Sequence, residues 1–145
     1  MDIEAIKADI KGRTKAAILK TQVDVENVFD KHIKRFYAGY KPLVYSRTGQ
    51  LKETPTKTAV RGLGLGAEGD VYLDPGKLHY LKNIQIVDEE DGSVRIWVNE
   101  WDGATVLSHA AYGSHGGMKG DGSSVWRGPV AELNGTAKGM IIKNL

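Results

Sequence analysis

Two histidines in a glycine-rich stretch are the residues with the clearest potential for chemistry. His109 and His115 stand 6 positions apart and Asp121 follows, so the three side chains could ligate a metal ion. Zinc sites built on one helix instead place two histidines one turn apart, with a glutamate between them. No acid separates His109 from His115, and glycines surround them. The spacing favours histidines in local hydrogen bonds, and no metal site is predicted.

Two other patterns imitate catalytic or cofactor motifs without their essential residues. Ser114 adjoins His115, but neighbouring side chains rarely aim at each other, and the Gly-x-Ser-x-Gly elbow is absent. Residues 62–69 (GLGLGAEG) are glycine-rich, yet Asp70 follows instead of the lysine and Ser/Thr of a phosphate-binding loop. We therefore predict no catalytic residue and no cofactor, and we interpret residues 62–69 as a flexible loop or a bulged strand.

Aromatic side chains could form a stacking platform for a base or a sugar. The residues concerned are Trp97, Trp101, Trp126 and Tyr112. A groove for single-stranded nucleic acid also needs interleaved lysines and arginines, whereas residues 81–126 contain 3 Lys and Arg against 7 Asp and Glu. Direct binding of nucleic acid is therefore not expected. Because aromatic residues are enriched in protein interfaces, we expect a protein partner instead.

The segment 110–127 carries the residues that we expect to bind this partner. It has 5 glycines and no hydrophobic periodicity, which is typical of a long loop, and long loops in compact domains are usually functional or mobile. Aromatic and arginine side chains dominate interface energetics, so its anchors are predicted to be Tyr112, His115, Trp126 and Arg127. For Trp126 an alternative stays open, in which the indole closes the core of the sheet.

The first 40 residues are predicted to be helical. Apolar residues recur there every three or four positions, at Val25, Val28, Phe29, Ile33, Phe36, Tyr37 and Tyr40. An unbroken helix over 2–36 would be about 50 Å long, whereas a compact domain of this length has a radius of gyration of ~15 Å. We therefore predict a break near Gly12 or around 21–23. The alternative is a projecting helix that another subunit buries.

Residues 41–56 are predicted to form a turn region after the helical segment. Pro42 ends the helix, because the residue before a proline disfavours the helical conformation. Thr48 and Gly49 form a turn in which glycine adopts a positive φ. Leu51 is then the first buried residue after the turn.

Residues 57–145 are predicted to form a β-sheet that includes the long loop 110–127. Segments with strand-like alternation or bounded by turn residues are 71–73, 84–86, 94–98, 104–108 and 139–143. We interpret them as an antiparallel meander with a short final strand. The expected fold is a single α+β domain over residues 1–145, with N-terminal helices packed against an antiparallel sheet that has long glycine-rich loops.

Composition limits the function classes. The chain has 145 residues, 41% hydrophobic and 26% charged, with no cysteine. No apolar run approaches the ~20 residues of a membrane helix, so no membrane partner is expected. The missing cysteines exclude disulfide scaffolds and thiol chemistry and fit synthesis in a reducing cytosol. Residues 1–60 carry 12 Lys and Arg against 7 Asp and Glu, and residues 61–145 carry 8 against 11. This charge split fits a basic helix with a solvated outer face, and it also allows copies to associate head to tail.

An ordered set of short motifs resembles a known family. A basic helical segment ends in YKPLVYSRTGQL (40–51), β-segments follow, and AYGSHGG (111–117) and WRGP (126–129) come after them. This order resembles the small head–tail joining or tail-completion (neck) proteins of long-tailed bacteriophages and prophages. The resemblance implies a non-enzymatic virion structural protein, made in the host cytoplasm. It also implies a homo-oligomeric ring at the phage neck that contacts other neck, portal-side or tail proteins.

Two other functions stay open on sequence grounds. A cell-wall-acting metal hydrolase would use His109 and His115, and its metal content after purification without chelator would identify it. A generic protein-interaction module would share the absence of a catalytic cluster, the charge split and the glycine-rich loops.

Overall fold

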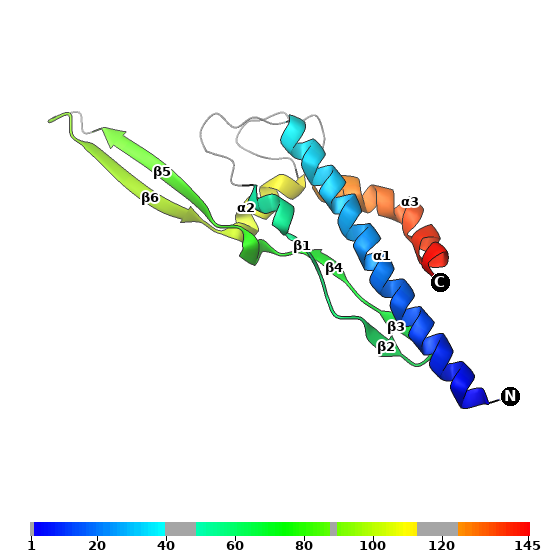
Figure 1. Ribbon diagram of the computed structural model, residues 1–145. Helices are drawn as coiled ribbons and strands as arrows, with labels where there is room; N and C mark the ends of the chain where they lie inside the picture. The colour runs from blue at the N-terminus through cyan, green and yellow to red at the C-terminus, as the bar shows by residue number, and fades with distance from the viewer. Residues whose placement is uncertain (1, 40–48, 88–89, 113–124) are drawn as a thin grey trace.

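The described residues form one long α-helix, two shorter α-helices, two short 3-10 helices and three small β-ribbons. A computed structural model describes residues 2–39, 49–87, 90–112 and 125–145 (Figure 1). The elements are α1 (Ile3–Gly39), η1 (Gln50–Glu53), β1 (Pro55–Lys57), β2 (Arg61–Leu63), β3 (Gly66–Glu68), β4 (Val71–Leu73), η2 (Pro75–Lys77), β5 (Tyr80–Val87), β6 (Val94–Trp101), α2 (Gly103–Tyr112) and α3 (Arg127–Asn144). A long N-terminal helix packed with antiparallel strands confirms the predicted α+β class.

Helix α1 is unbroken over its 37 residues, so the predicted break is wrong. Gly12 has open space around its Cα, and a single interior glycine costs about 1 kcal/mol relative to alanine without ending a helix. At the other expected break, the buried Thr21 donates its hydroxyl to the Ala17 carbonyl at 2.8 Å. The helix is therefore about 55 Å long at ~1.5 Å per residue, and its N-terminal end projects past the neighbouring elements (Figure 1).

The strands form three separate two-stranded antiparallel sheets: β1 with β4, β2 with β3, and β5 with β6. Expected strands 71–73, 84–86 and 94–98 are confirmed. The expected meander is wrong on both sides of the β5–β6 pair. The strand 71–73 pairs with β1 instead of β5, 104–108 lies in α2, and 139–143 lies in α3. The glycine-rich residues 62–69 form the regular β2–β3 hairpin instead of a loop or a bulge.

An unrecognised cap explains why α2 is a helix. The Asp102 carboxylate accepts a hydrogen bond from the Thr105 backbone N–H at 3.2 Å, and the Asp102 carbonyl accepts from Val106 N–H at 3.1 Å. An aspartate in this position satisfies donors that a helix start leaves open. Further along α2, Ala110 and Ala111 are buried in the core.

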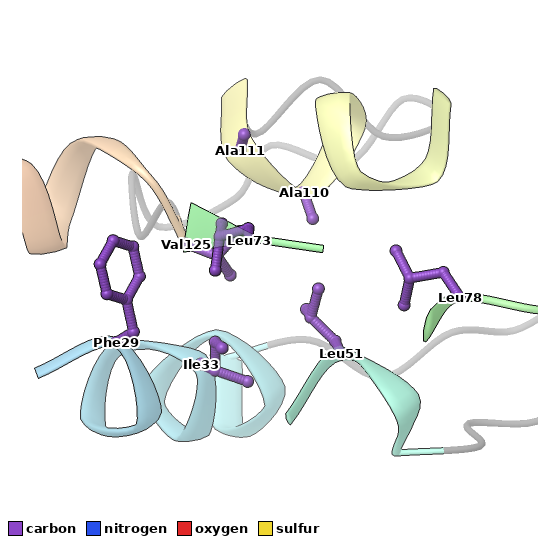
Figure 2. Packing of buried hydrophobic residues seen from close by; sticks show 8 residues of the cluster. All are labelled: Phe29, Ile33, Leu51, Leu73, Leu78, Ala110, Ala111 and Val125. Carbon is purple, nitrogen blue, oxygen red and sulfur yellow. The ribbon is translucent and has the colours of Figure 1, made fainter. Parts of the chain in front are cut away.

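The hydrophobic core lies where the C-terminal part of α1 meets η1, β4, α2 and the start of α3 (Figure 2). Its buried members are Phe29, Ile33, Leu51, Leu73, Leu78, Ala110, Ala111 and Val125. Figure 2 shows Ile33 of α1, Leu51 of η1 and Val125, which precedes α3, gathered in this cluster. The core thus joins segments from both halves of the chain around one end of α1.

Polar contacts attach α1 to the elements on both of its sides. Asn144 in α3 donates to Thr21 Oγ1 at 3.2 Å and to the Asp24 carboxylate at 2.8 Å. On the other side, the buried Gln22 amide donates to the carbonyls of Thr58 and Asp70, each at 3.0 Å. Because both faces are held, the register of α1 against α3 and against the β-ribbons is fixed.

Candidate interaction surfaces

Helix α3 covers only part of one face of α1. It starts beside His32 and ends where the Arg13 guanidinium donates to the Leu145 carbonyl at 3.2 Å. Between these points the face carries the buried Ala17, Thr21 and Val28. This geometry fixes where the intramolecular cover of α1 stops.

The same face of α1 continues toward the N-terminus without cover. With 3.6 residues per turn, Ile10, Ile6 and Ile3 extend the row that Ala17 begins. Their exposed fractions are 40%, 40% and 64%. We call Ile3, Ile6 and Ile10 the isoleucine stripe. A face that is buried under α3 therefore becomes an exposed apolar surface beyond the end of α3.

A second surface lies between the N-terminal half of α1 and the β2–β3 hairpin. Lys11, Gly12 and Lys15 line an open groove of about 440 Å³ together with Gly62 and Gly64. We call it the lysine groove. A Cβ on Gly62 would lie 3.1 Å from Lys15 Cε, so the lysine stem crosses the hairpin backbone closely. Gly64 adopts a φ of 58°, which closes the hairpin turn at the groove.

The lysine groove concentrates like charge on one side of the helix. Lys7, Lys11 and Lys15 are four residues apart in sequence and all exposed, and Lys7 pairs with Glu4 at 2.8 Å. Like charges at this spacing destabilise an isolated helix by roughly 0.2–0.5 kcal/mol per pair. Helix stability therefore does not account for this row.

The β5–β6 hairpin forms a third surface, which projects from the body of the molecule (Figure 1). Its eight-residue strands pair in register from Tyr80 opposite Trp101 to Val87 opposite Val94. At its far end Asp91 accepts a hydrogen bond from the Ser93 backbone N–H at 2.7 Å. Hydrogen bonds from the Ser93 side chain and backbone hold the pKa of Asp91 below its ordinary value. The hairpin thus carries an ionised carboxylate at its tip.

A smaller hollow lies at the base of this hairpin. It is lined by Pro75, Gly76, Leu78, His79, Asp102, Gly103 and Ala104. Its polar groups serve the fold, because Asp102 caps α2 and the His79 backbone N–H donates to Gln50 Oε1 at 2.6 Å. A Cβ on Gly103 would lie 2.1 Å from the Pro75 carbonyl oxygen, so α2 is seated tightly at the hairpin base.

The predicted anchors of 110–127 are placed only in part. Trp126 precedes α3, is 40% exposed, and its ring centroid lies 6.0 Å from that of Phe29. Arg127 is exposed at the first position of α3. Tyr112 is the last residue of α2, and His115 lies outside the described residues. Trp126 is therefore partly exposed and also contacts the core through Phe29.

The expectation of one long loop over 110–127 is wrong at both of its ends. Ala110 and Ala111 belong to helix α2 and are buried, and Val125 is fully buried. The Val125 backbone N–H donates to the Ala110 carbonyl at 3.4 Å. Residues 113–124 between them lie outside the described part of the chain. Both ends of the segment are thus anchored in the core.

The predicted turn residues divide in the same way. Gly49 has a φ of 77°, and Leu51 is 3% exposed within the core, so both expectations are confirmed. The Leu51 backbone N–H also donates to Tyr37 Oη at 3.2 Å. Pro42 and Thr48 lie outside the described residues. The turn therefore places Leu51 against the C-terminal end of α1.

The two histidines of the candidate metal site are placed only in part. His109 lies in the backbone of α2, His115 falls outside the described residues, and His32 is a buried histidine whose Nε2 lies 2.7 Å from Glu132 Oε2. Among residues 2–39, 49–87, 90–112 and 125–145, no group of 3 or more His, Cys, Asp or Glu is arranged to hold a metal ion.

Sequence reasoning missed the surfaces on α1. The spacing of Ile3, Ile6 and Ile10 is visible in the sequence, but it does not tell where α3 ends. The lysine groove needs the β2–β3 hairpin to lie beside Lys11 and Lys15, a long-range contact that no local pattern indicates.

Within the described part of the chain, no helix is both long enough and apolar enough to cross a membrane. Comparisons with protein-family models, with curated proteins and with solved structures find no match to this chain.

Proposed function

We propose that this protein is a non-enzymatic structural component of a phage particle. It acts as a head–tail connector or tail-completion protein and assembles as a homo-oligomeric ring at the neck, in contact with other neck, portal-side or tail proteins. The observation that carries the proposal is the isoleucine stripe, because it continues a buried helix face beyond its intramolecular cover. The motif order around residues 40–51, 111–117 and 126–129 supports the same assignment by resemblance.

The isoleucine stripe favours assembly on energetic grounds. Fully burying an isoleucine side chain contributes about 1.5–3 kcal/mol relative to leaving it exposed. Ile3, Ile6 and Ile10 keep 64%, 40% and 40% of their surface in water in the single chain. A neighbouring subunit that covers the stripe would bury this exposed surface, and the burial would stabilise the assembly. This is the projecting-helix alternative of the sequence analysis, in which another subunit buries the helix.

The β5–β6 hairpin supports the proposal independently. Among the described residues, the sheet that contains β5 and β6 consists of these two strands, and an isolated two-stranded hairpin is marginally stable in water. Its outer edges offer backbone groups to which another chain can add. A ring supplies neighbours on both sides, so it would stabilise both the hairpin and the N-terminal end of α1.

Sedimentation velocity and negative-stain imaging test the proposal. The purified protein is expected to form closed rings whose population grows with concentration. Ile6→Asp should shift it toward monomer by placing a charge within the stripe. Val23→Asp is the matched control, because Val23 is 41% exposed on a different side of α1, and it should leave the rings intact.

Two results would contradict the proposal. One is a strict monomer at every soluble concentration together with absence of the chain from purified particles. The other is ring formation by Ile6→Asp that equals that of the wild type and of Val23→Asp, which would remove the observation on which the proposal depends.

A further inference from the structure

Two surfaces of opposite charge lie at opposite ends of the molecule. The lysine groove lies at the N-terminal half of α1, and the tip of the β5–β6 hairpin lies on the far side of the body (Figure 1). The groove carries Lys11 and Lys15, and the tip carries Glu90 and Asp91. Because the hairpin points away from the groove, the two surfaces of one chain cannot meet each other.

The lysine groove combines positive charge with an accessible backbone, which suits an acidic turn. Lys11 and Lys15 are exposed, and within the described part of the chain neither has an ion-pair partner. Gly62 and Gly64 line the groove without side chains, so an incoming segment can approach the hairpin backbone closely. The groove is open to solvent, and its volume of about 440 Å³ leaves room for a few residues of a turn.

The hairpin tip has the complementary properties. Glu90 and Asp91 are exposed, and the sequence places Asp88 and Glu89 directly before them. The contact with Ser93 fixes the Asp91 carboxylate in the turn at 2.7 Å. Strands of 8 residues at ~3.3 Å per residue extend about 26 Å, which carries the tip well clear of its own body. The tip is thus presented to another molecule.

We propose that the Glu90–Asp91 tip of one copy docks into the lysine groove of a second copy. This inference rests on the proposed ring, and it names the contact between adjacent subunits. Glu90 and Asp91 lie against Lys11 and Lys15 of the neighbour. Because the two surfaces differ, the contact is heterologous and repeats from copy to copy, which closes into a ring when the rotation between copies permits it.

Charge reversal at each surface, followed by mixing, tests the contact. The variant Lys11→Glu/Lys15→Glu places acidic residues on both surfaces. The variant Glu90→Lys/Asp91→Lys places lysines on both surfaces and offsets the negative charge of the neighbouring Asp88 and Glu89. Each alone should require a protein concentration at least roughly tenfold higher for half-assembly than the wild type, because like charges then face each other. An equimolar mixture of the two should regain assembly, since every junction between unlike variants is complementary again.

Two controls separate the contact from general effects of charge. Lys138→Glu/Lys143→Glu changes the net charge as Lys11→Glu/Lys15→Glu does, but at exposed positions of α3. This control should assemble like the wild type. Asp91→Asn keeps the acceptor for Ser93 and tests whether the turn survives, by amide exchange in the hairpin. Wild-type assembly should weaken as salt rises, because exposed charge pairs are screened.

The outcomes distinguish this contact from the ring itself. Reversed variants that assemble as well as the wild type, or a mixture that does not recover, would overturn the docking of the tip in the groove while the ring remains. A wild type that never assembles would contradict the proposed ring and this contact with it. Recovery only in the mixture, with the Lys138→Glu/Lys143→Glu control unaffected, is the expected result.

Discussion

The two ends of α1 carry similar apolar residues in different surroundings. Near the C-terminal end, Phe29 and Ile33 are buried by η1, α2 and the start of α3. Near the N-terminal end, Ile3 and Ile6 project from a helix that α3 no longer covers. The difference shows that the single chain stabilises one half of its helix through a core and leaves the other half available. The covered half specifies the fold, and we assign assembly to the uncovered half.

Helix continuity explains why the uncovered half still forms. Helix nucleation is costly whereas each added residue contributes its own hydrogen bond, so a helix held at one end by packing can extend beyond it. The residues from Asp2 to Ile10 rely mainly on this extension, with local help from the pair of Lys7 and Glu4. Tertiary contacts begin near Arg13, which donates to the Leu145 carbonyl. They should therefore exchange amide hydrogens faster than residues near Ile33.

The largest expected difference in stability comes from one alanine substitution in each half of α1. Ile33→Ala should lower the free energy of unfolding by about 2–5 kcal/mol, because it deletes a fully buried side chain and leaves a cavity. Ile6→Ala should change the free energy of unfolding of the monomer by less than about 0.5 kcal/mol. Denaturant unfolding at low protein concentration measures both. An equal loss for the two variants in a demonstrated monomer would mean that the two halves do not differ.

The turn that delivers Leu51 to the covered half gives the next largest effect. Leu51→Ala should cost roughly 2–4 kcal/mol, since Leu51 is buried against the end of α1. Gly49→Val should also lower the melting temperature, because a φ of 77° strains a residue with a Cβ by about 1–2 kcal/mol. Thermal unfolding tests both. Unchanged stability combined with lost assembly would identify this turn as a contact surface instead.

The comparison also shows which parts of the fold the sequence could predict. The C-terminal half of α1, the β5–β6 strands and the glycine at position 49 follow from local periodicity and turn chemistry, and all were predicted. Residues 104–108 were assigned to a strand, although Asp102 and Thr105 form a helix cap. Helix α3 was missed because Gly135 and Gly139 obscure its spacing, and packing on α1 outweighs their low helix propensity.

The interaction surfaces were less predictable than the fold. Trp126 and Arg127 were chosen by residue type, and type alone does not tell how far an indole contacts Phe29. The isoleucine stripe depends on where α3 ends, and the lysine groove depends on a hairpin more than 40 residues further along the chain. Such surfaces come from long-range packing, which a single sequence does not encode in any local pattern.

Trp126 combines properties of both halves of α1, because it is partly exposed and also contacts the core. It is 40% exposed, yet its ring packs against Phe29 of the covered half. Trp126→Ala should lower the free energy of unfolding by about 1–2 kcal/mol through loss of this aromatic contact and of partial burial. It should also weaken assembly beyond that loss, if the exposed edge binds a partner.

Trp126→Phe is the matched control, because it retains an aromatic ring against Phe29. Stability measured by denaturant and assembly measured by sedimentation then separate the two roles. Global unfolding of Trp126→Ala would assign the residue to the core alone, whereas a stable variant with normal assembly would remove it from the interface.

The smallest expected effect comes from the polar contact that joins α3 to the covered half. Glu132 accepts a hydrogen bond from Lys31 Nζ at 2.5 Å and lies 2.7 Å from His32 Nε2. The pKa of Glu132 lies below its ordinary value of 4.5 because of these two hydrogen bonds. The hydrogen bond from Lys31 has the larger effect, and the one from His32 adds to it. A lowered pKa in the folded state means that the contribution to stability is complete above about pH 4.5 and is lost as pH falls through the folded value.

Unfolding measured between pH 7 and pH 3 should therefore show a loss of stability below about pH 4.5 in the wild type, and Glu132→Gln should lack that part of the loss. Asp30→Asn is the control, because Asp30 pairs with Lys34 inside α1 at 2.6 Å and joins no two elements. The Glu132 substitution should also raise amide exchange at the start of α3 while leaving the N-terminal end of α1 unchanged. If exchange rises instead around Ile3 and Ile6, the two halves of the helix are coupled and cannot be treated as separate regions.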